Sequence, residues 1–270
     1  MIVTGQRDQA EQLRARGAAY LRKTLPTTVG GQNARWNEPV CPVAVNVRAA
    51  TAKLFADRVR ETAMAIGAEA AKPDCRPNIA IVFAADAGAA LREIGRRQPT
   101  TFDALTGPER RALFASKAPV RWWHHNRITG ADGRELSGVS AALGFAGFGA
   151  GANAPVLSGT RTTRLDAPTV VGITGAVVLI DVPLASGQDL SALADYVAMI
   201  ALSRVRANVA DRPDDSILSL FEADPRPAAL SDFDTAFLRA LYSGPPNQNG
   251  LLQRSMMAGA MRDTITGAEK

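Results

Sequence analysis

The run VVGITGAVVLI at Val170–Ile180, followed by LSALADYVAMIALSRV at Leu190–Val205, decides how this sequence of 270 residues folds. The first run is almost continuously apolar, which is typical of a strand buried on both faces. The second run is preceded by Ser186 and Asp189, two residue types that favour the start of a helix. A buried strand that leads directly into an apolar helix indicates a sheet covered by helices.

The remainder of the chain also alternates between strand and helix patterns. From Cys41 onward, strands and helices follow one another, and a crossover of this kind favours parallel neighbouring strands. At Thr106, the threonine with Pro108 and Glu109 predicts a helix that begins with a capping box. The predicted strands are 43–47, 78–84, 118–125, 161–165 and 170–182, and the predicted helices are 7–23, 49–70, 86–97, 106–116, 189–205, 231–242 and 251–261.

These patterns predict an α+β fold with a mixed β-sheet flanked by helices. We expect residues 1–37 to form an N-terminal helical arm and linker, 38–244 the α+β domain, and 245–270 a C-terminal helix and tail. The composition, 46% hydrophobic and 21% charged, is that of a globular protein. The longest apolar run is shorter than the roughly 20 residues that a transmembrane helix needs, so the sequence predicts no membrane span.

The two cysteines, Cys41 and Cys75, each stand just before a predicted strand. Two such positions meet at one end of a sheet, so we predict a disulfide, although two separate buried thiols fit the same sequence. A disulfide indicates an oxidising compartment, and hence a periplasmic or secreted protein. The chain begins without the charged-then-apolar pattern of a signal peptide, so we expect an exported protein to be represented here in its mature form.

The formal net charge of +5 is concentrated near the N-terminus, where residues 1–60 contain ten basic and four acidic side chains. The acidic residues are interleaved with the basic ones, and no aromatic residues are interspersed for stacking on bases. The pattern therefore predicts a solvated face and no nucleic-acid binding.

Histidines are too few for most metal sites and catalytic triads. The only two, His124 and His125, are adjacent in a predicted strand, so their side chains point to opposite faces of the sheet. They cannot both ligate one metal, and no Gly-x-Ser-x-Gly motif accompanies them. We predict no metal site, no cofactor and no catalytic residue.

A stretch rich in glycine and alanine at 138–159 includes GFAGFGAG at 144–151. A dinucleotide-binding loop needs a strand before it and a helix after it, and neither pattern is present here. We interpret the stretch as an apolar surface loop and a candidate contact surface.

The order of elements from Val170 to Gly244 resembles the C-terminal half of a metzincin-type zinc peptidase, particularly of the matrixin-like group. In that family the active-site helix carries H-E-x-x-H-x-x-G-x-x-H, a Met-turn of the Ser-Ile-Met-Ser kind follows, and the last helix ends in a Leu-Tyr pair. Here the helix 189–205 is followed by SILS at 216–219 and by a helix that ends in Leu241-Tyr242. The chain is also similar to uncharacterised secreted bacterial proteins that keep this architecture without the zinc ligands.

The zinc ligands of the family are missing from the matching positions. The resemblance places Ala194, Ala198 and Arg204 at the three histidines, Asp195 at the glutamate general base, Ala201 at the glycine and Leu218 at the Met-turn methionine. A zinc peptidase needs its ligands to hold the metal and to acidify the bound water. The resemblance therefore implies a scaffold without that hydrolytic activity.

We accordingly predict an exported, non-catalytic metzincin-like protein that binds protein or peptide partners in the cell envelope. Asp195, Tyr196 and Arg204 are the candidate cleft residues, although Asp195 and Tyr196 fit a purely structural role as well. The alternative is an enzyme of another class that uses Asp195 and Arg204, or a histidine at 124–125, in a cleft. A third interpretation is a structural envelope component with a permanent partner. The sequence leaves the ligand and the oligomeric state open.

Overall fold

The computed structural model describes residues 2–26, 32–134, 166–207 and 216–267. The predicted loop 138–159 and the predicted strand 161–165 lie outside these residues. No helix in the described ranges is long and apolar enough to cross a membrane. The elements, including two short 3-10 helices labelled η, are α1 (Ile2–Thr24), β1 (Arg35–Trp36), β2 (Pro42–Val45), α2 (Ala49–Ala65), β3 (Ile79–Ala84), α3 (Ala87–Arg97), η2 (Pro99–Phe102), α4 (Gly107–Ala115), β4 (Val120–Gly130), β5 (Thr169–Asp181), α5 (Leu190–Leu202), η4 (Ile217–Ser219), α6 (Asp232–Ser243) and α7 (Gly250–Thr266).

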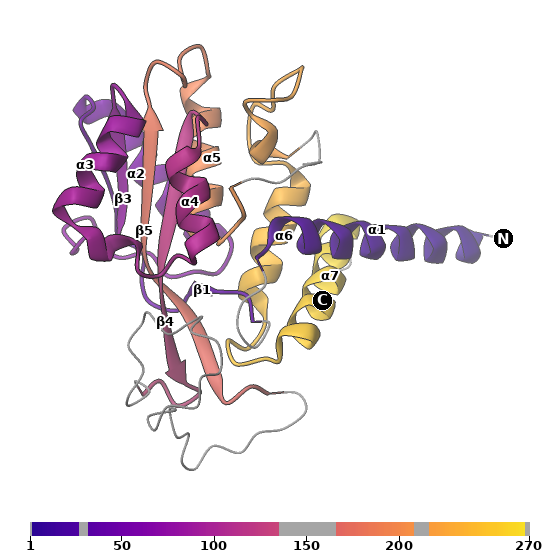
Figure 1. The fold of residues 1–270 in the computed structure, drawn as a ribbon. Helices are drawn as coiled ribbons and strands as arrows, with labels where there is room; N and C mark the ends of the chain where they lie inside the picture. Colours follow the sequence, from indigo (N-terminus) through magenta and orange to yellow (C-terminus); the bar gives the residue numbers. More distant parts are fainter. Residues whose placement is uncertain (1, 27–31, 135–165, 208–215, 268–270) are drawn as a thin grey trace.

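The sheet is mixed, as the sequence predicts, and β5 lies at its centre (Figure 1). On one side β5 pairs in parallel with β3, which pairs in parallel with β2. On the other side β4 runs antiparallel along nearly the whole of β5, from Val120 opposite Ile180 to Gly130 opposite Thr169. The two-residue strand β1, which the sequence predicts only as part of an extended connector, pairs in parallel with β5 at Gly172 and Ile173.

The alternation of side chains along the strands divides the core into two clusters. Ile81 and Val178 point to the face covered by α2 and α5 and belong to the larger cluster. Leu179 and Trp123 point to the opposite face and pack with Leu91 of α3, together with residues of η2 and α4. The helices therefore lie on both faces of the sheet, which confirms the prediction of a mixed sheet flanked by helices.

Helix α5 is buried along almost its entire length. Asp189 caps it by accepting hydrogen bonds from the backbone N–H groups of Ser191 and Ala192, at 2.8 and 3.0 Å. Every residue from Ala192 to Leu202 is buried, and the helix contacts β5, α2, η4 and α6. It ends at Leu202, three residues before the predicted end, because the backbone of the next residue is extended.

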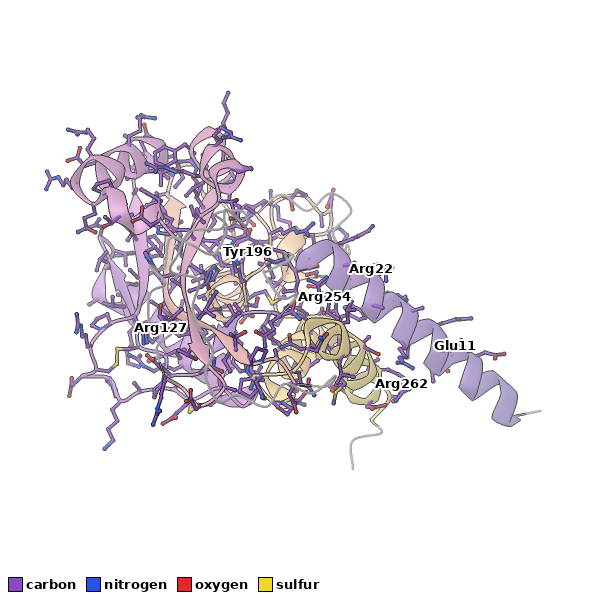
Figure 2. All side chains as sticks on the ribbon, turned by 60° about the horizontal axis from the view of Figure 1, so that its bottom comes forward. Glu11, Arg22, Arg127, Tyr196, Arg254 and Arg262 are labelled. Atoms are coloured by element: carbon purple, nitrogen blue, oxygen red, sulfur yellow. A yellow bond between two sulfur atoms is a disulfide. The ribbon has the colours of Figure 1, made fainter. Side chains whose placement is uncertain are left out.

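Helix α1 packs on the C-terminal helix α7 through its second half only (Figure 1). Tyr20 and Leu21 of this half are buried, and the Tyr20 ring meets the edges of Phe233 and Phe237 of α6. The first half extends away from the rest of the molecule, and Glu11 on it points into solvent (Figure 2). The second half of α1 is thus held to α6 by aromatic packing, and it lies close to Ala258 and Met261 of α7 at Gly17.

The predicted disulfide between Cys41 and Cys75 is confirmed, with the two Cα atoms 6.1 Å apart. It joins the start of β2 to the loop before β3. Asn78 stabilises the same junction, because its side chain accepts from Cys41 N–H at 2.7 Å and donates to the Pro39 carbonyl oxygen at 3.0 Å. The disulfide therefore links the neighbouring strands β2 and β3 close to their N-terminal ends.

We expect the double substitution Cys41→Ser and Cys75→Ser to lower the free energy of unfolding by about 3–4 kcal/mol, because it removes the restraint on the unfolded chain. The two cysteines are separated by 34 positions in sequence, which sets the size of the closed loop. Urea denaturation followed by circular dichroism measures the change. A reductant should destabilise the natural protein and leave the double variant unchanged; equal midpoints for the oxidised protein and the variant would contradict the prediction.

Candidate functional site

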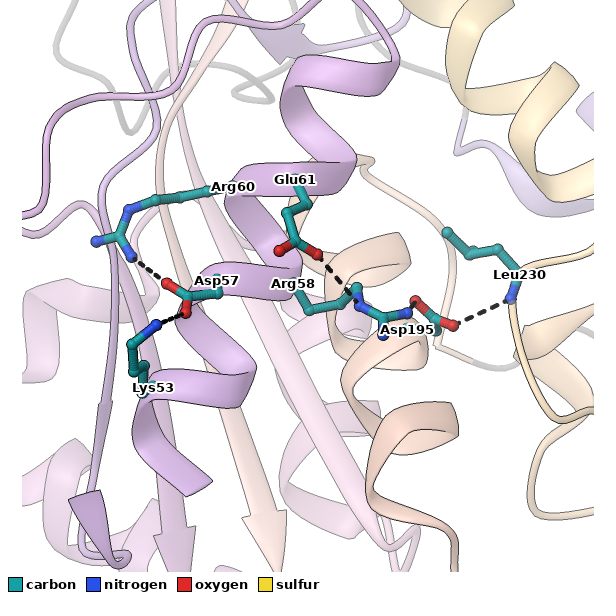
Figure 3. Close-up of polar contacts among 7 residues, drawn as sticks. All are labelled: Lys53, Asp57, Arg58, Arg60, Glu61, Asp195 and Leu230. Carbon is teal, nitrogen blue, oxygen red and sulfur yellow. Dashed lines mark hydrogen bonds and ion pairs between the residues drawn. The ribbon is translucent and has the colours of Figure 1, made fainter. Parts of the chain in front are cut away.

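Asp195, which the resemblance places at the general base, is buried and connects α5 to neighbouring elements. Its side chain is 3% exposed, and Oδ1 accepts a hydrogen bond from Nη1 of Arg58 on α2 at 2.6 Å. Oδ2 accepts from the backbone N–H of Leu230, just before α6, at 3.3 Å (Figure 3). Arg58 also approaches Glu61 on its own helix, at 3.8 Å. A general base needs a lone pair directed at a proton to be removed, whereas both oxygens of Asp195 hold neighbouring elements together.

Tyr196 and Arg204, the other candidate cleft residues, contact different parts of the structure. The ring of Tyr196 meets the edges of Trp122 and Phe221, with ring centres 6.2 and 5.3 Å apart. Arg204 Nη2 donates to Glu109 Oε1, in the first turn of α4, at 3.1 Å. The three candidates thus have different partners: Asp195 contacts α2, Tyr196 contacts an aromatic cluster, and Arg204 contacts α4.

The other positions assigned by the resemblance lie inside the core. Ala194 and Ala198 of α5 are completely buried, and so is Ala201. Leu218 in η4 is 2% exposed. The Tyr242 hydroxyl donates to the Leu202 carbonyl oxygen at 2.7 Å, which fixes the end of α6 against the end of α5. On α5, small apolar residues therefore fill the positions at which the family has its first two zinc-binding histidines.

The two histidines lie on opposite faces of β4, as the sequence predicts. His124 is buried on the α5 face, and its Nε2 donates to the Ile200 carbonyl oxygen at 2.9 Å. Burial, assisted by the charge of Arg204, lowers the pKa of His124 to about 3, so the ring is neutral. His125 lies on the other face, with Nε2 3.4 Å from Thr101 Oγ1, and burial lowers its pKa as well. Among the described residues, no group of three or more His, Cys, Asp or Glu side chains is placed to hold a metal ion.

Asp234 forms a second buried junction, which was not predicted from the sequence. It accepts hydrogen bonds from the Ser216 hydroxyl at 2.6 Å, from Ile217 N–H at 2.7 Å and from Ser231 N–H at 3.1 Å. The Tyr20 hydroxyl approaches the same carboxylate at 3.5 Å. Burial raises the pKa of Asp234, while the hydrogen bonds from Ser216, Ile217 and Ser231 oppose the shift. The sequence indicates only part of this role: Ser231 and Asp234 form the capping box at the start of α6, which places Asp234 at the helix N-terminus.

An open groove of about 840 Å³ lies between α3 and α4. Arg92 and Arg96 of α3 line it on one side, and Arg110 and Phe114 of α4 line it on the other. This groove is on the opposite face of the sheet from α5 and Asp195. This groove was not predicted from the sequence, because the charge pattern indicated a basic excess near the N-terminus. The sequence feature that indicates a basic surface here is the two Arg-Arg pairs, at 96–97 and 110–111.

No model of a protein family matches this chain. Comparisons with curated proteins and with solved structures found no match either. We therefore infer its function from the residues and contacts of the chain itself.

We expect Asp195→Ala to lower the free energy of unfolding by about 2 kcal/mol, because it leaves Arg58 without its main partner and the Leu230 N–H without an acceptor. This is below the usual cost of breaking a buried pair, since the Arg58 side chain is 30% exposed and water compensates part of the loss. Urea denaturation measures the effect. The control is Asp57→Ala in the surface pairs with Lys53 and Arg60, where we expect a change within about 0.5 kcal/mol. Equal losses in both variants would rule out a special role for the buried pair.

We also expect His124 to make stability depend on pH. An unfolded histidine titrates near pH 6.5, whereas folded His124 stays neutral to about pH 3. Between these values the unfolded chain binds a proton that the folded chain does not. The free energy of unfolding therefore falls below about pH 6.5, with a contribution from His124 that approaches about 1.4 kcal/mol per pH unit.

The measurement is urea denaturation between about pH 6.5 and about pH 5, a range in which histidines dominate the titration. His124→Gln keeps a donor for Ile200 and should lose this part of the pH dependence. His125, whose pKa is lowered as well, contributes separately, so His125→Gln should retain the part of the pH dependence that His124 supplies, and the double variant should lose both parts. A pH dependence unchanged in His124→Gln would show that the buried ring does not contribute.

Proposed function

We propose that this protein is an exported, non-hydrolytic binding protein with a metzincin-like architecture, and that its ligands are proteins or peptides of the cell envelope. The observation that carries the proposal is the burial of α5 from Ala192 to Leu202. A helix that supports catalysis must present polar side chains to a cleft, but α5 is covered from Ala192 to Leu202 by the elements around it. We therefore assign α5 to the scaffold.

The contacts of Asp195 support the absence of hydrolysis. A catalytic zinc site needs three protein ligands, a position open to water and a nearby base. Ala194 and Ala198 provide no ligand atoms, and Arg204 is paired with Glu109. Asp195 is held by Arg58 and Leu230. The one carboxylate of α5, that of Asp195, is thus not available to solvent as a base.

The order of the elements supports the metzincin-like part of the proposal. The strand β5 leads into α5, the 3-10 turn η4 follows, and α6 ends with Leu241 and Tyr242 against the end of α5. Ser216 caps η4 by accepting from Leu218 N–H at 3.2 Å, so the tight turn expected at 216–219 has a local cause. In this proposal the architecture is retained while alanine replaces metal-binding side chains of α5.

The disulfide supports the proposed compartment, because such bonds persist in oxidising surroundings.

Binding is supported by surface features that catalysis does not require. The groove between α3 and α4 is open and lined with arginines. Leu251 and Met256 on α7 are exposed by 83% and 47%, so apolar side chains are also available for contact.

We expect the purified protein to retain no zinc when one equivalent is added, and to bind peptides without cleaving them. Native mass spectrometry tests the first expectation. Panning of a displayed random-peptide library tests the second: an enriched consensus should bind saturably, and its mass should be unchanged after incubation.

Each outcome is informative. Tight stoichiometric zinc, or cleavage of the enriched peptides, would overturn the non-hydrolytic assignment; Asp195→Ala then shows whether that residue takes part. Failure to enrich any consensus would overturn the peptide-binding assignment. Enriched peptides that stay intact, with no retained zinc, support both parts of the proposal.

A further inference from the structure

The segment that contains α3 and α4 is strongly basic. Residues 87–121 contain seven Lys or Arg side chains and three acidic ones, a net charge of +4. Two of the acidic side chains are already paired: Glu93 with Arg96 and Arg97, and Glu109 with Arg204, which lies outside this segment. Three arginines therefore face the groove between the two helices against a single glutamate, Glu93.

A buried arginine with unused donors lies beneath the first turn of α3, where Gly88 precedes the groove residue Ala89. Arg121, on β4, is only 6% exposed, yet its Nε and Nη1 have no hydrogen-bond partner among the described residues. Burying a cationic group without partners is costly, so such donors indicate an absent acceptor. Arg121 lies on the same face of β4 as Trp123, beneath α3 and α4.

Arg121 and Arg92 converge at the first turn of α3. Nη1 of Arg92 and Nη1 of Arg121 lie 3.5 and 3.6 Å from the position that a Cβ on Gly88 would take. The two nitrogen atoms are therefore at most about 7 Å apart, a separation that one carboxylate can bridge with two charge-assisted hydrogen bonds of about 2.8 Å.

The acidic side chains nearby already have partners. Asp86 Oδ1 lies 3.1 Å from the same point and caps α3 by accepting from Ala89 N–H at 2.8 Å. Asp181 accepts from Ala87 N–H at 3.0 Å and from Leu184 N–H at 3.2 Å. These carboxylates satisfy the amides of the first turn. The pKa of Asp86 is lowered first by the hydrogen bond from Ala89 N–H and further by the charges of Arg92 and Arg121. One carboxylate thus faces two guanidinium groups, which leaves a positive charge for a ligand.

An aromatic side chain completes the groove. Phe114 is 38% exposed, and the guanidinium of Arg110 lies over its ring at 5.9 Å and over that of Phe102 at 5.6 Å. At Gly95, an added Cβ would approach Phe114 Cζ to 3.3 Å, so glycine lets α3 lie close to this ring. The groove thus combines positive charge with an apolar contact.

We propose that the groove between α3 and α4 binds an acidic segment of a protein partner. One carboxylate of the segment lies between Arg92 and Arg121, further acidic side chains meet Arg96 and Arg110, and an apolar side chain packs on Phe114. This inference rests on the proposed peptide-binding function and specifies its site and ligand chemistry. Charge complementarity selects the partner, since the groove presents three arginines and a single glutamate.

Fluorescence anisotropy tests the proposal with three fluorescein-labelled peptides added to the full chain. The first alternates Glu and Asp around a central Phe, the second replaces the acidic residues by Ser, and the third replaces them by Lys. We expect saturable binding of the acidic peptide only, and weaker binding as NaCl is added. Arg92→Gln and Arg110→Gln should each weaken binding about fivefold or more, because a charge-assisted hydrogen bond or ion pair is lost.

Arg111→Gln is the matched control, because Arg111 neighbours Arg110 on α4 and does not line the groove; we expect less than a twofold change. Phe114→Ala should weaken binding without altering its dependence on salt. Arg121→Gln should weaken binding and should unfold at the same temperature as the natural protein. If Arg121→Gln fails to fold because Arg121 is buried, Arg92→Gln still tests the proposal.

Several outcomes overturn the inference. Equal losses in Arg111→Gln and Arg110→Gln would show a general effect of charge. Tighter binding of a single-stranded oligonucleotide, or of phosphatidylglycerol vesicles, with the same sensitivity to Arg92→Gln would assign the groove to another ligand class. If the library yields a consensus that is not acidic and is insensitive to Arg92→Gln, this inference fails while the proposed function stands. If no peptide binds at all, both fail.

Discussion

The structure depends on the need to cover α5 on every side. Its residues from Ala192 to Leu202 are apolar except for Asp195 and Tyr196, so no face of the helix is suited to water. Burial of such side chains contributes about 25 cal/mol per Å² of apolar surface, and this hydrophobic effect is the main driving force of folding. The sheet and α2 cover one side of the helix, while η4 and α6 cover another. The layered arrangement in Figure 1 follows from this requirement.

The buried polar groups around α5 join elements and leave few atoms free for chemistry. Asp195 links α5 to α2 and to the segment before α6. His124 of β4 donates to the carbonyl oxygen of Ile200, and Asp234 joins η4 to α6. Residue types that are common in active sites therefore serve here as partners for buried donors and acceptors. Arg121 differs, since two of its nitrogen atoms are buried without a described partner.

This contrast separates the scaffold from the proposed binding surface. The side chains of α5 from Ala192 to Leu202 are buried, whereas α3 and α4 on the other face of the sheet present an open basic groove. Alanine at 194 and 198 suits this buried helix, because a small apolar side chain packs in the core without a polar partner. Binding properties are more easily built on the outer helices, where substitutions affect the core least.

Local patterns were sufficient to predict most of the elements. Hydrophobic periodicity located β5 and α5, and the capping box at Thr106 located α4, because these signals act between residues close in sequence. The opposite directions of His124 and His125 followed from strand geometry alone. The predicted strand 118–125 continues to Gly130, and α7 extends five residues past its predicted end, since the pattern weakens where packing is partial.

Contacts between distant residues were decided only by the tertiary structure. The strand β1 is too short to carry a pattern, and it exists because β5 offers a free edge at Gly172 and Ile173. Arg58 and Asp195 are 137 positions apart, so nothing in the sequence indicates that they pair. Likewise, Arg92 and Arg121 converge at Gly88 only because β4 is stacked beneath α3. By itself, the sequence determined most of the elements and the sides to which strand residues point, and it predicted the disulfide; the pairing of buried charges required the packed fold, because it depends on distances across the core.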